Sequence, residues 1–164
     1  MSQSSASTIT RTGSCRCKQV TFSVTGPRIF GLLCHCRACR LGTSAPLSHV
    51  IGVPSNSFTW TSGNELVKTV PLTTRFNGMY CGSCGCYLAQ QGVEEPWSTF
   101  MGTMACCYDQ MKEAFCPREE VKDEFFTPNM HINYENRVID VKDDLPKYLD
   151  APKEWNGSGK TAEQ

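Results

Sequence analysis

Cysteine is the residue type with the most chemistry to offer in this sequence. The chain has 11 cysteines in 164 residues, and seven of them fall in three tightly spaced groups. The groups are Cys15 and Cys17, then Cys34, Cys36 and Cys39, then Cys81 and Cys84. An odd number of thiols cannot all pair within one chain, and closely spaced reduced cysteines are typical of metal sites or catalysis. The spacing therefore predicts bound metal rather than a disulfide framework.

The first and third groups complement each other. The CGSC segment at 81–84 is a CxxC motif, which supplies two of the four ligands that a structural zinc ion needs, and its glycines suit the turn. The CRC segment at 15–17 is the obvious source of the other two ligands. Two spaced pairs argue against a set of buried, inert thiols. We therefore expect one structural zinc ion bound by Cys15, Cys17, Cys81 and Cys84.

The middle group, CHCRAC at 34–39, has three thiols within six residues. Three protein ligands with an open fourth position are typical of catalytic zinc, so we expect Cys34, Cys36 and Cys39 to bind a catalytic zinc ion. Consecutive residues of an extended segment point to opposite sides, so His35 is expected to face away from the ion or to orient a sulfur. The alternative is a second structural zinc closed by a remote cysteine, with Cys86 ahead of Cys106 and Cys107.

Charge is distributed unevenly along the chain, although the formal net charge is zero. Residues 1–80 carry eight basic residues and one acidic residue, whereas residues 81–164 carry eight basic and fifteen acidic ones. The basic residues interleave with the thiols, as at Arg37 and Arg40. They either offset the charge of bound thiolates or form a pocket for an anionic substrate. The zero net charge and the acidic second half argue against a nucleic-acid partner.

The elements that must position these cysteines are mostly short strands separated by turn signals. Alternating or continuous short apolar runs predict strands at 19–25, 29–33, 47–53, 58–61, 65–71, 73–80, 87–91 and 98–104. Residues 109–115 are the one convincing helix. Residues 130–134 and 137–141 are expected to pair as a late hairpin. The pattern predicts a mainly β, zinc-binding single domain with short helical turns.

Length and composition place the chain among ordinary globular proteins, with 40% hydrophobic and 20% charged residues. Its longest apolar run, 29–34, is far shorter than the ~20 residues of a membrane span. Residues 1–10 show no secretory or transit signal, which predicts a cytoplasmic protein. We expect a flexible tail at 1–12, the zinc domain at 13–150 and a polar tail at 151–164.

Three motifs together resemble a known family. GSCRC at 13–17, CHCRAC at 34–39 and YCGSCGC at 80–86 occur in the order and spacing of the glutathione-dependent formaldehyde-activating enzymes, also called the GFA/CENP-V family. FTWTSG at 58–63, Gly102-Thr103, His131-Ile132 and DDLPKY at 143–148 are softer matches. The resemblance covers residues 13–150. Its departures are Arg40-Leu41, the segment 138–140 and the additional thiol of Cys86, none of which removes a predicted zinc ligand.

The resemblance implies a β-rich zinc fold similar to that of guanine-nucleotide-release factors for Rab proteins. It assigns the structural zinc to Cys15, Cys17, Cys81 and Cys84, and the catalytic zinc to Cys34, Cys36 and Cys39. The implied activity is that of S-(hydroxymethyl)glutathione synthase, a carbon–sulfur lyase in the reverse sense that uses formaldehyde and glutathione. His131 is the candidate general acid or base, although a histidine in an apolar strand more often packs in the core.

Zinc chemistry supports the same activity independently of the family. A coordinating thiol is deprotonated, and zinc does not change oxidation state, so addition to a carbonyl or its reversal suits such a site. The leading hypothesis is a zinc-dependent carbon–sulfur lyase or synthase whose partners are a small thiol, glutathione, and an aldehyde, formaldehyde by default. The alternatives are a zinc-stabilised protein-interaction module and a zinc lyase that acts on another thiol adduct in biosynthesis.

Overall fold

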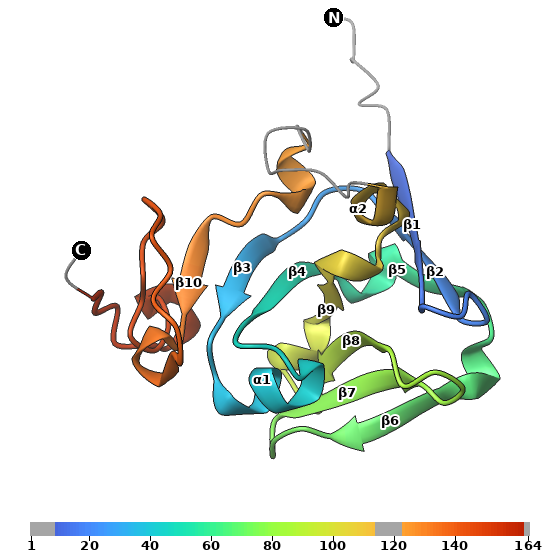
Figure 1. Ribbon diagram of the computed structural model, residues 1–164, viewed down its shortest axis with the longest axis horizontal. Helices are drawn as coiled ribbons and strands as arrows, with labels where there is room; N and C mark the ends of the chain where they lie inside the picture. The colour runs from blue at the N-terminus through green and yellow to red at the C-terminus, as the bar shows by residue number, and fades with distance from the viewer. Residues whose placement is uncertain (1–8, 114–122, 163–164) are drawn as a thin grey trace, which may run out of the picture.

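The fold is mainly β and forms one small domain, as the sequence predicts (Figure 1). The computed structural model describes residues 9–113 and 123–162, and within these ranges ten strands form two sheets. The smaller sheet is antiparallel, in the order β1-β2-β5. Its strands are β1 (Thr10–Ser14), β2 (Thr21–Thr25) and β5 (Phe58–Ser62).

The larger sheet has seven strands in the order β10-β3-β4-β9-β8-β7-β6. All neighbouring strands are antiparallel except β10 and β3, which are parallel. The strands are β3 (Phe30–Cys34), β4 (Ser48–Pro54), β6 (Val67–Pro71), β7 (Phe76–Cys81), β8 (Tyr87–Gly92), β9 (Phe100–Met104) and β10 (Met130–Ile132). Each strand from 19 to 104 predicted from the sequence is present, with its bounds shifted by up to three residues.

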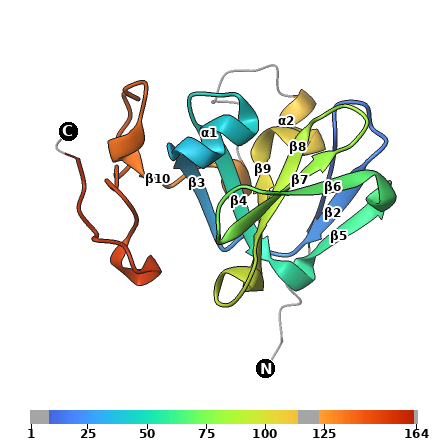
Figure 2. The same cartoon turned by 90° about the horizontal axis from the view of Figure 1, so that it is seen from below.

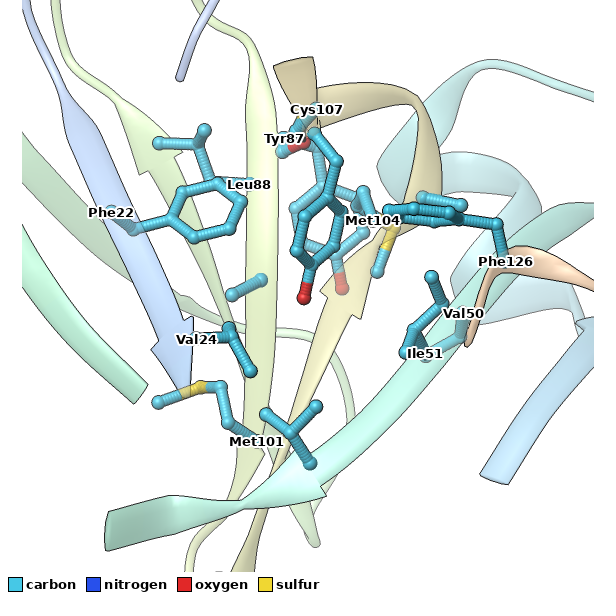
Figure 3. Close-up of a cluster of buried hydrophobic side chains, with 14 of the residues drawn as sticks. Phe22, Val24, Val50, Ile51, Tyr87, Leu88, Met101, Met104, Cys107 and Phe126 are labelled. Atoms are coloured by element: carbon cyan, nitrogen blue, oxygen red, sulfur yellow. Dashed lines mark hydrogen bonds between the residues drawn. The ribbon is translucent and has the colours of Figure 1, made fainter. Parts of the chain in front are cut away.

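The hydrophobic core lies between the two sheets (Figure 3). Phe22 and Val24, on one face of β2, are fully buried, as their alternation predicts. The Phe22 ring packs edge-on against Tyr108, with 5.1 Å between ring centroids. Burial of each such side chain contributes about 1.5–3 kcal/mol. The core therefore fixes the small sheet on the large one, and with it the two hairpin turns that carry four of the cysteines.

Two short α-helices accompany the sheets, α1 (Arg37–Thr43) and α2 (Asp109–Glu113). Helix α2 matches the predicted helix at 109–115 as far as residue 113, beyond which the prediction lies outside the described residues. Helix α1 was not predicted, because its seven residues are too few to show an apolar period. Short 3₁₀ turns complete the fold at Ser55–Ser57, Asn64–Leu66, Trp97–Thr99, Ala105–Cys107, Glu124–Phe126, Tyr134–Asn136 and Lys153–Trp155.

The predicted late hairpin is wrong. Strand β10 pairs in parallel with β3, with His131 opposite Leu33, and residues 137–141 form no strand. Asn133 takes a left-handed conformation with φ 53°, and the chain then turns through the 3₁₀ segment Tyr134–Asn136. Because this turn ends the extended backbone, β10 pairs with the edge of β3 instead of with the residues that follow it.

The two ends of the domain extend beyond the predicted boundaries. Residues 10–12, which the sequence analysis assigns to a tail, belong to β1, because Thr10 pairs with Thr25. At the other end, the segment 151–162 turns back, and its residues 160–162 lie alongside residues 147–149. The Ala162 amide donates to the Lys147 carbonyl, and the Leu149 amide donates to the Lys160 carbonyl. This C-terminal segment lies next to β10, at the opposite end of the molecule from β2 and β5 (Figure 2). In the described ranges, no helix combines the length and the apolar character needed to cross a bilayer.

Candidate metal centres

Four cysteines from the β1–β2 and β7–β8 hairpins, called here the four-cysteine group, lie close together. Cys15 and Cys17 lie in the turn from β1 to β2, Cys81 is the last residue of β7, and Cys84 lies in the turn from β7 to β8. The four Sγ atoms all lie within 4.8 Å of one another. The Sγ–Sγ distance is 3.4 Å for Cys15 and Cys17 and 3.8 Å for Cys17 and Cys81. A tetrahedral zinc ion with four thiolates sets its sulfurs about 3.8 Å apart, so the group fits zinc.

Local backbone conformation brings these sulfurs together. In the first turn, Lys18 is left-handed with φ 63°, and the Val20 amide donates to the Cys15 sulfur at 3.3 Å. In the second turn, Gly85 is left-handed with φ 69°, and its amide donates to the Cys81 carbonyl. Glycine adopts this conformation without steric cost. A metal ion here would connect the three-stranded sheet to the seven-stranded sheet.

The three remaining clustered cysteines lie where β3 passes into α1. Cys34 ends β3, Cys36 is the N-cap of α1 and Cys39 lies in its first turn. Their Sγ atoms also lie within 4.8 Å of one another. The Cys39 amide donates to the Cys36 sulfur at 3.3 Å, and the Asn133 side-chain amide donates to the Cys34 sulfur at 3.8 Å. No local sequence signal marks Asn133, because its contact depends on the pairing of β10 with β3.

The electrostatics of this group favour a bound cation. Hydrogen bonds from the thiols of Cys34 and Cys39, and from backbone amides, lower the pKa of Cys36 to about 3. The resulting thiolate keeps its neighbours protonated: hydrogen bonding to Cys36 raises the pKa of Cys34 to about 12, and the pKa of Cys39 is raised by hydrogen bonding to both. Three adjacent thiolates require a cation to offset their repulsion.

Within the described residues, the three-cysteine group has no fourth histidine, cysteine or carboxylate ligand. The remote thiols that could have closed it lie elsewhere. The Cys86 sulfur is 3.8 Å from the Cys107 sulfur, and neither belongs to the three-cysteine group. Cys106 is exposed, and Cys116 lies outside the described residues. A four-coordinate metal ion held by these three sulfurs would need one further ligand that the described part of the chain does not supply.

His35 and His131 form a buried pair behind the three-cysteine group. Both rings are 0% exposed, and His35 Nε2 lies 2.9 Å from His131 Nδ1. His131 Nε2 lies 3.0 Å from the Asp143 carboxylate, which also accepts a hydrogen bond from the Lys147 ammonium at 2.9 Å. Because a carboxylate only accepts, His131 donates to Asp143. The chain of contacts connects the CHCRAC segment to the C-terminal part of the domain.

This pairing settles the position of both histidines. His35 lies outside the group of metal-ligating atoms, and its ring is directed to His131 rather than to the sulfurs. Burial, together with the neighbouring His131, lowers the pKa of His35 to about 4 and keeps its ring neutral. The Tyr134 ring packs edge-on against both imidazoles. His131 is therefore a packed core residue, the alternative that the sequence already favoured, and it also holds His35 by a hydrogen bond.

A cavity of about 720 Å³ opens at the three-cysteine group. Cys34, Cys36 and Cys39 line it together with residues of β3, β4, β8, β9 and β10 and of the C-terminal segment at 150–157. Neither Arg37 nor Arg40 lines this cavity: Arg37 is exposed, and Arg40 Nε donates to the His35 carbonyl. Of the two roles that the sequence left open for these arginines, a pocket for an anionic substrate is not formed at this cavity. Among its lining residues, Arg75 carries the positive charge.

Comparisons with known proteins agree with this arrangement. A crystal structure of a Rhodobacter sphaeroides protein from a structural genomics programme superposes with a TM-score of 0.52 at 15% identity, over 68% of this chain and 95% of that chain. At this identity the likeness concerns the fold alone. No curated protein matches the sequence. The sequence model of one family, described as glutathione-dependent formaldehyde-activating enzyme, matches residues 10–129. The chain belongs to this glutathione-dependent formaldehyde-activating enzyme family.

Proposed function

We propose that this protein is a zinc-dependent carbon–sulfur lyase or synthase that acts on glutathione adducts. Its default reaction is the formation of S-(hydroxymethyl)glutathione from formaldehyde and glutathione. The observation that carries the proposal is the three-cysteine group, which lines a cavity and has no fourth ligand among the described residues. Family membership supports glutathione and formaldehyde as the small-molecule partners.

The reaction is an addition without any net redox change. The glutathione sulfur forms a bond to the carbonyl carbon, the carbonyl π pair moves to oxygen, and the thiol proton ends on the new hydroxyl. Cys34, Cys36 and Cys39 would hold a zinc ion that, when bound, favours the thiolate form of a coordinated substrate thiol. The reverse reaction breaks the same carbon–sulfur bond.

Other residues support the two metal sites. Cys15, Cys17, Cys81 and Cys84 would hold the structural zinc that links the two sheets. The Asn133 amide donates to the Cys34 sulfur and so stabilises negative charge there. The His35–His131 pair fixes the backbone between Cys34 and Cys36, because both rings are buried and hydrogen-bonded.

The reaction can be tested by exchange spectroscopy on formaldehyde and glutathione at equilibrium. We expect faster exchange with the zinc-loaded protein and loss of this enhancement in Cys36→Ser. Cys106→Ser is the matched control, because Cys106 is exposed and lies outside both cysteine groups. Equal exchange rates with and without the wild-type protein would remove formaldehyde as a substrate.

Metal coordination separates an enzyme from an interaction module. Cobalt-substituted protein should show a change in its thiolate charge-transfer absorption when glutathione is added, because a further sulfur joins the three-cysteine group. An interaction module predicts two closed four-ligand sites and no change with small thiols. If both sites have four protein ligands, the catalytic proposal is refuted and the zinc ions serve as structural supports.

A further inference from the structure

The cavity beside the three-cysteine group has a continuous aromatic wall. The five rings that line it are Phe30, Phe76, Trp97, Phe100 and Trp155. The Phe30 ring lies 5.3 Å from Phe100 and 5.1 Å from Trp155, centroid to centroid. Phe76 lies 5.9 Å from Trp97 and 6.3 Å from Phe100. The rings thus form one connected surface, the aromatic wall.

The sheet register places this wall and the sulfurs on one face. Phe30, Leu32 and Cys34 alternate along β3 and all line the cavity. The backbone opposite Phe30 is Gly52, and a Cβ there would lie 2.3 Å from the Phe30 ring. Glycine at 52 therefore leaves the space that the Phe30 ring occupies. The same strand carries a ring at one end of the cavity and a sulfur at the other.

Charged side chains form a small part of the cavity lining. Arg75 is exposed, and it is joined in the lining by two acidic residues, Asp150 and Glu154. Asp150 already accepts hydrogen bonds from the amide and the hydroxyl of Ser158. A one-carbon hydroxymethyl group would leave most of the aromatic wall without a contact. The wall instead suits a flat apolar group, for which aromatic contacts are favourable.

We propose that the carbon group on the substrate sulfur is aromatic, so that the physiological adduct derives from an aromatic aldehyde rather than from formaldehyde. The sulfur of the adduct lies at the three-cysteine group, and its ring lies on the aromatic wall. In the forward direction, the thiol sulfur bonds to the aldehyde carbon and the thiol proton moves to the oxygen, giving R–S–CH(OH)–aryl. This inference rests on the carbon–sulfur chemistry of the proposed function and replaces its default aldehyde, formaldehyde, by an aromatic one at the same site.

The test compares two stable thioethers that share the glutathione body, S-benzylglutathione and S-methylglutathione. Their dissociation constants for the zinc-loaded protein are measured by titration calorimetry. We expect the benzyl compound to bind about 10- to 100-fold more tightly, from burial of one phenyl ring. Trp155→Ala, and separately Trp97→Ala, should reduce this preference to about threefold or less, because each removes part of the wall. Trp60→Phe is the control, since Trp60 packs on Phe22 and Phe58 in the other sheet.

The outcomes distinguish this inference from the proposed function. Equal affinities for the two thioethers, or no binding of either, would overturn the aromatic proposal. A benzyl preference that persists in both tryptophan variants would also overturn it, because the ring would then bind away from the wall. Formaldehyde–glutathione exchange tests the proposed reaction separately: enhanced exchange without a benzyl preference refutes the aromatic class alone. A benzyl preference that both variants weaken, without enhanced exchange, supports the aromatic ligand and refutes formaldehyde as a substrate.

Discussion

The substitution His131→Ala tests the idea that a buried hydrogen-bonded chain supports the three-cysteine group. His131 is fully buried between His35 and Asp143, at 2.9 and 3.0 Å. Its removal leaves His35 Nε2 without this partner, and His35 Nδ1 has no partner within the described structure. Asp143 keeps its contact with Lys147. Each buried polar group left unpaired lowers the free energy of unfolding by about 1–3 kcal/mol, and the space left by the missing imidazole lowers it further.

We therefore expect His131→Ala to lose about 3–5 kcal/mol of unfolding free energy, measured by urea denaturation of the zinc-loaded protein. His49→Ala is the matched control, because His49 is half-buried on β4 and is not one of the hydrogen-bonded residues His35, His131 and Asp143. It should lose about 1 kcal/mol. A loss below about 1 kcal/mol in His131→Ala, or one equal to that of the control, would refute the reasoning.

The same variant gives a second readout. Because His35 lies between Cys34 and Cys36, a loosened His35 ring should weaken cobalt binding at the three-cysteine group by about 10- to 100-fold. The four-cysteine group should keep its affinity, since its turns lie on other strands. Cobalt titration followed by the thiolate charge-transfer bands measures both sites. Equal weakening at both sites would indicate general unfolding instead of a local support.

Three further predictions concern stability. Chelation of the metal should lower the thermal transition sharply, because the four-cysteine group connects two sheets; an unchanged calorimetric transition in metal-free protein would contradict this. Arg11→Ala should cost about 1–3 kcal/mol in urea unfolding, since the buried Arg11 pairs with Asp123 at 2.9 Å and lies 4.0 Å above the Phe125 ring. Arg16→Ala is the control: because Arg16 is exposed, its substitution should change the free energy of unfolding far less. Hydrogen bonds from Ser158 lower the pKa of Asp150 to about 2, so its stabilisation is complete above the ordinary value of 3.8 and is lost as pH falls through 2. Thermal unfolding of Asp150→Asn should accordingly be less sensitive to pH between these values than that of the wild type, and equal sensitivity would contradict the assignment.

The strands between residues 19 and 104 were predictable because their signals are local. In β2, Phe22 and Val24 alternate with polar residues and point into the core, as period two requires. The late hairpin failed for a non-local reason. Residues 130–132 resemble any short strand, and their partner is β3, about 100 residues earlier in the chain. Helix α1 was missed because the sequence CHCRAC carries a metal-ligand pattern and too few apolar residues to display a helical period.

The sequence by itself determined which residues could hold metal, because ligand type and spacing within a turn are local properties. Sequence spacing alone groups the cysteines into the pairs 15/17 and 81/84 and the trio 34/36/39. In the structure, the sulfurs of the two pairs converge, as do those of the trio. The tertiary structure alone decided what surrounds them. The His35–His131–Asp143 chain, the Asn133 contact with Cys34 and the aromatic wall join residues from β3, β9, β10 and the C-terminal segment. Such contacts depend on strand order and register across the sheet, which no local pattern encodes.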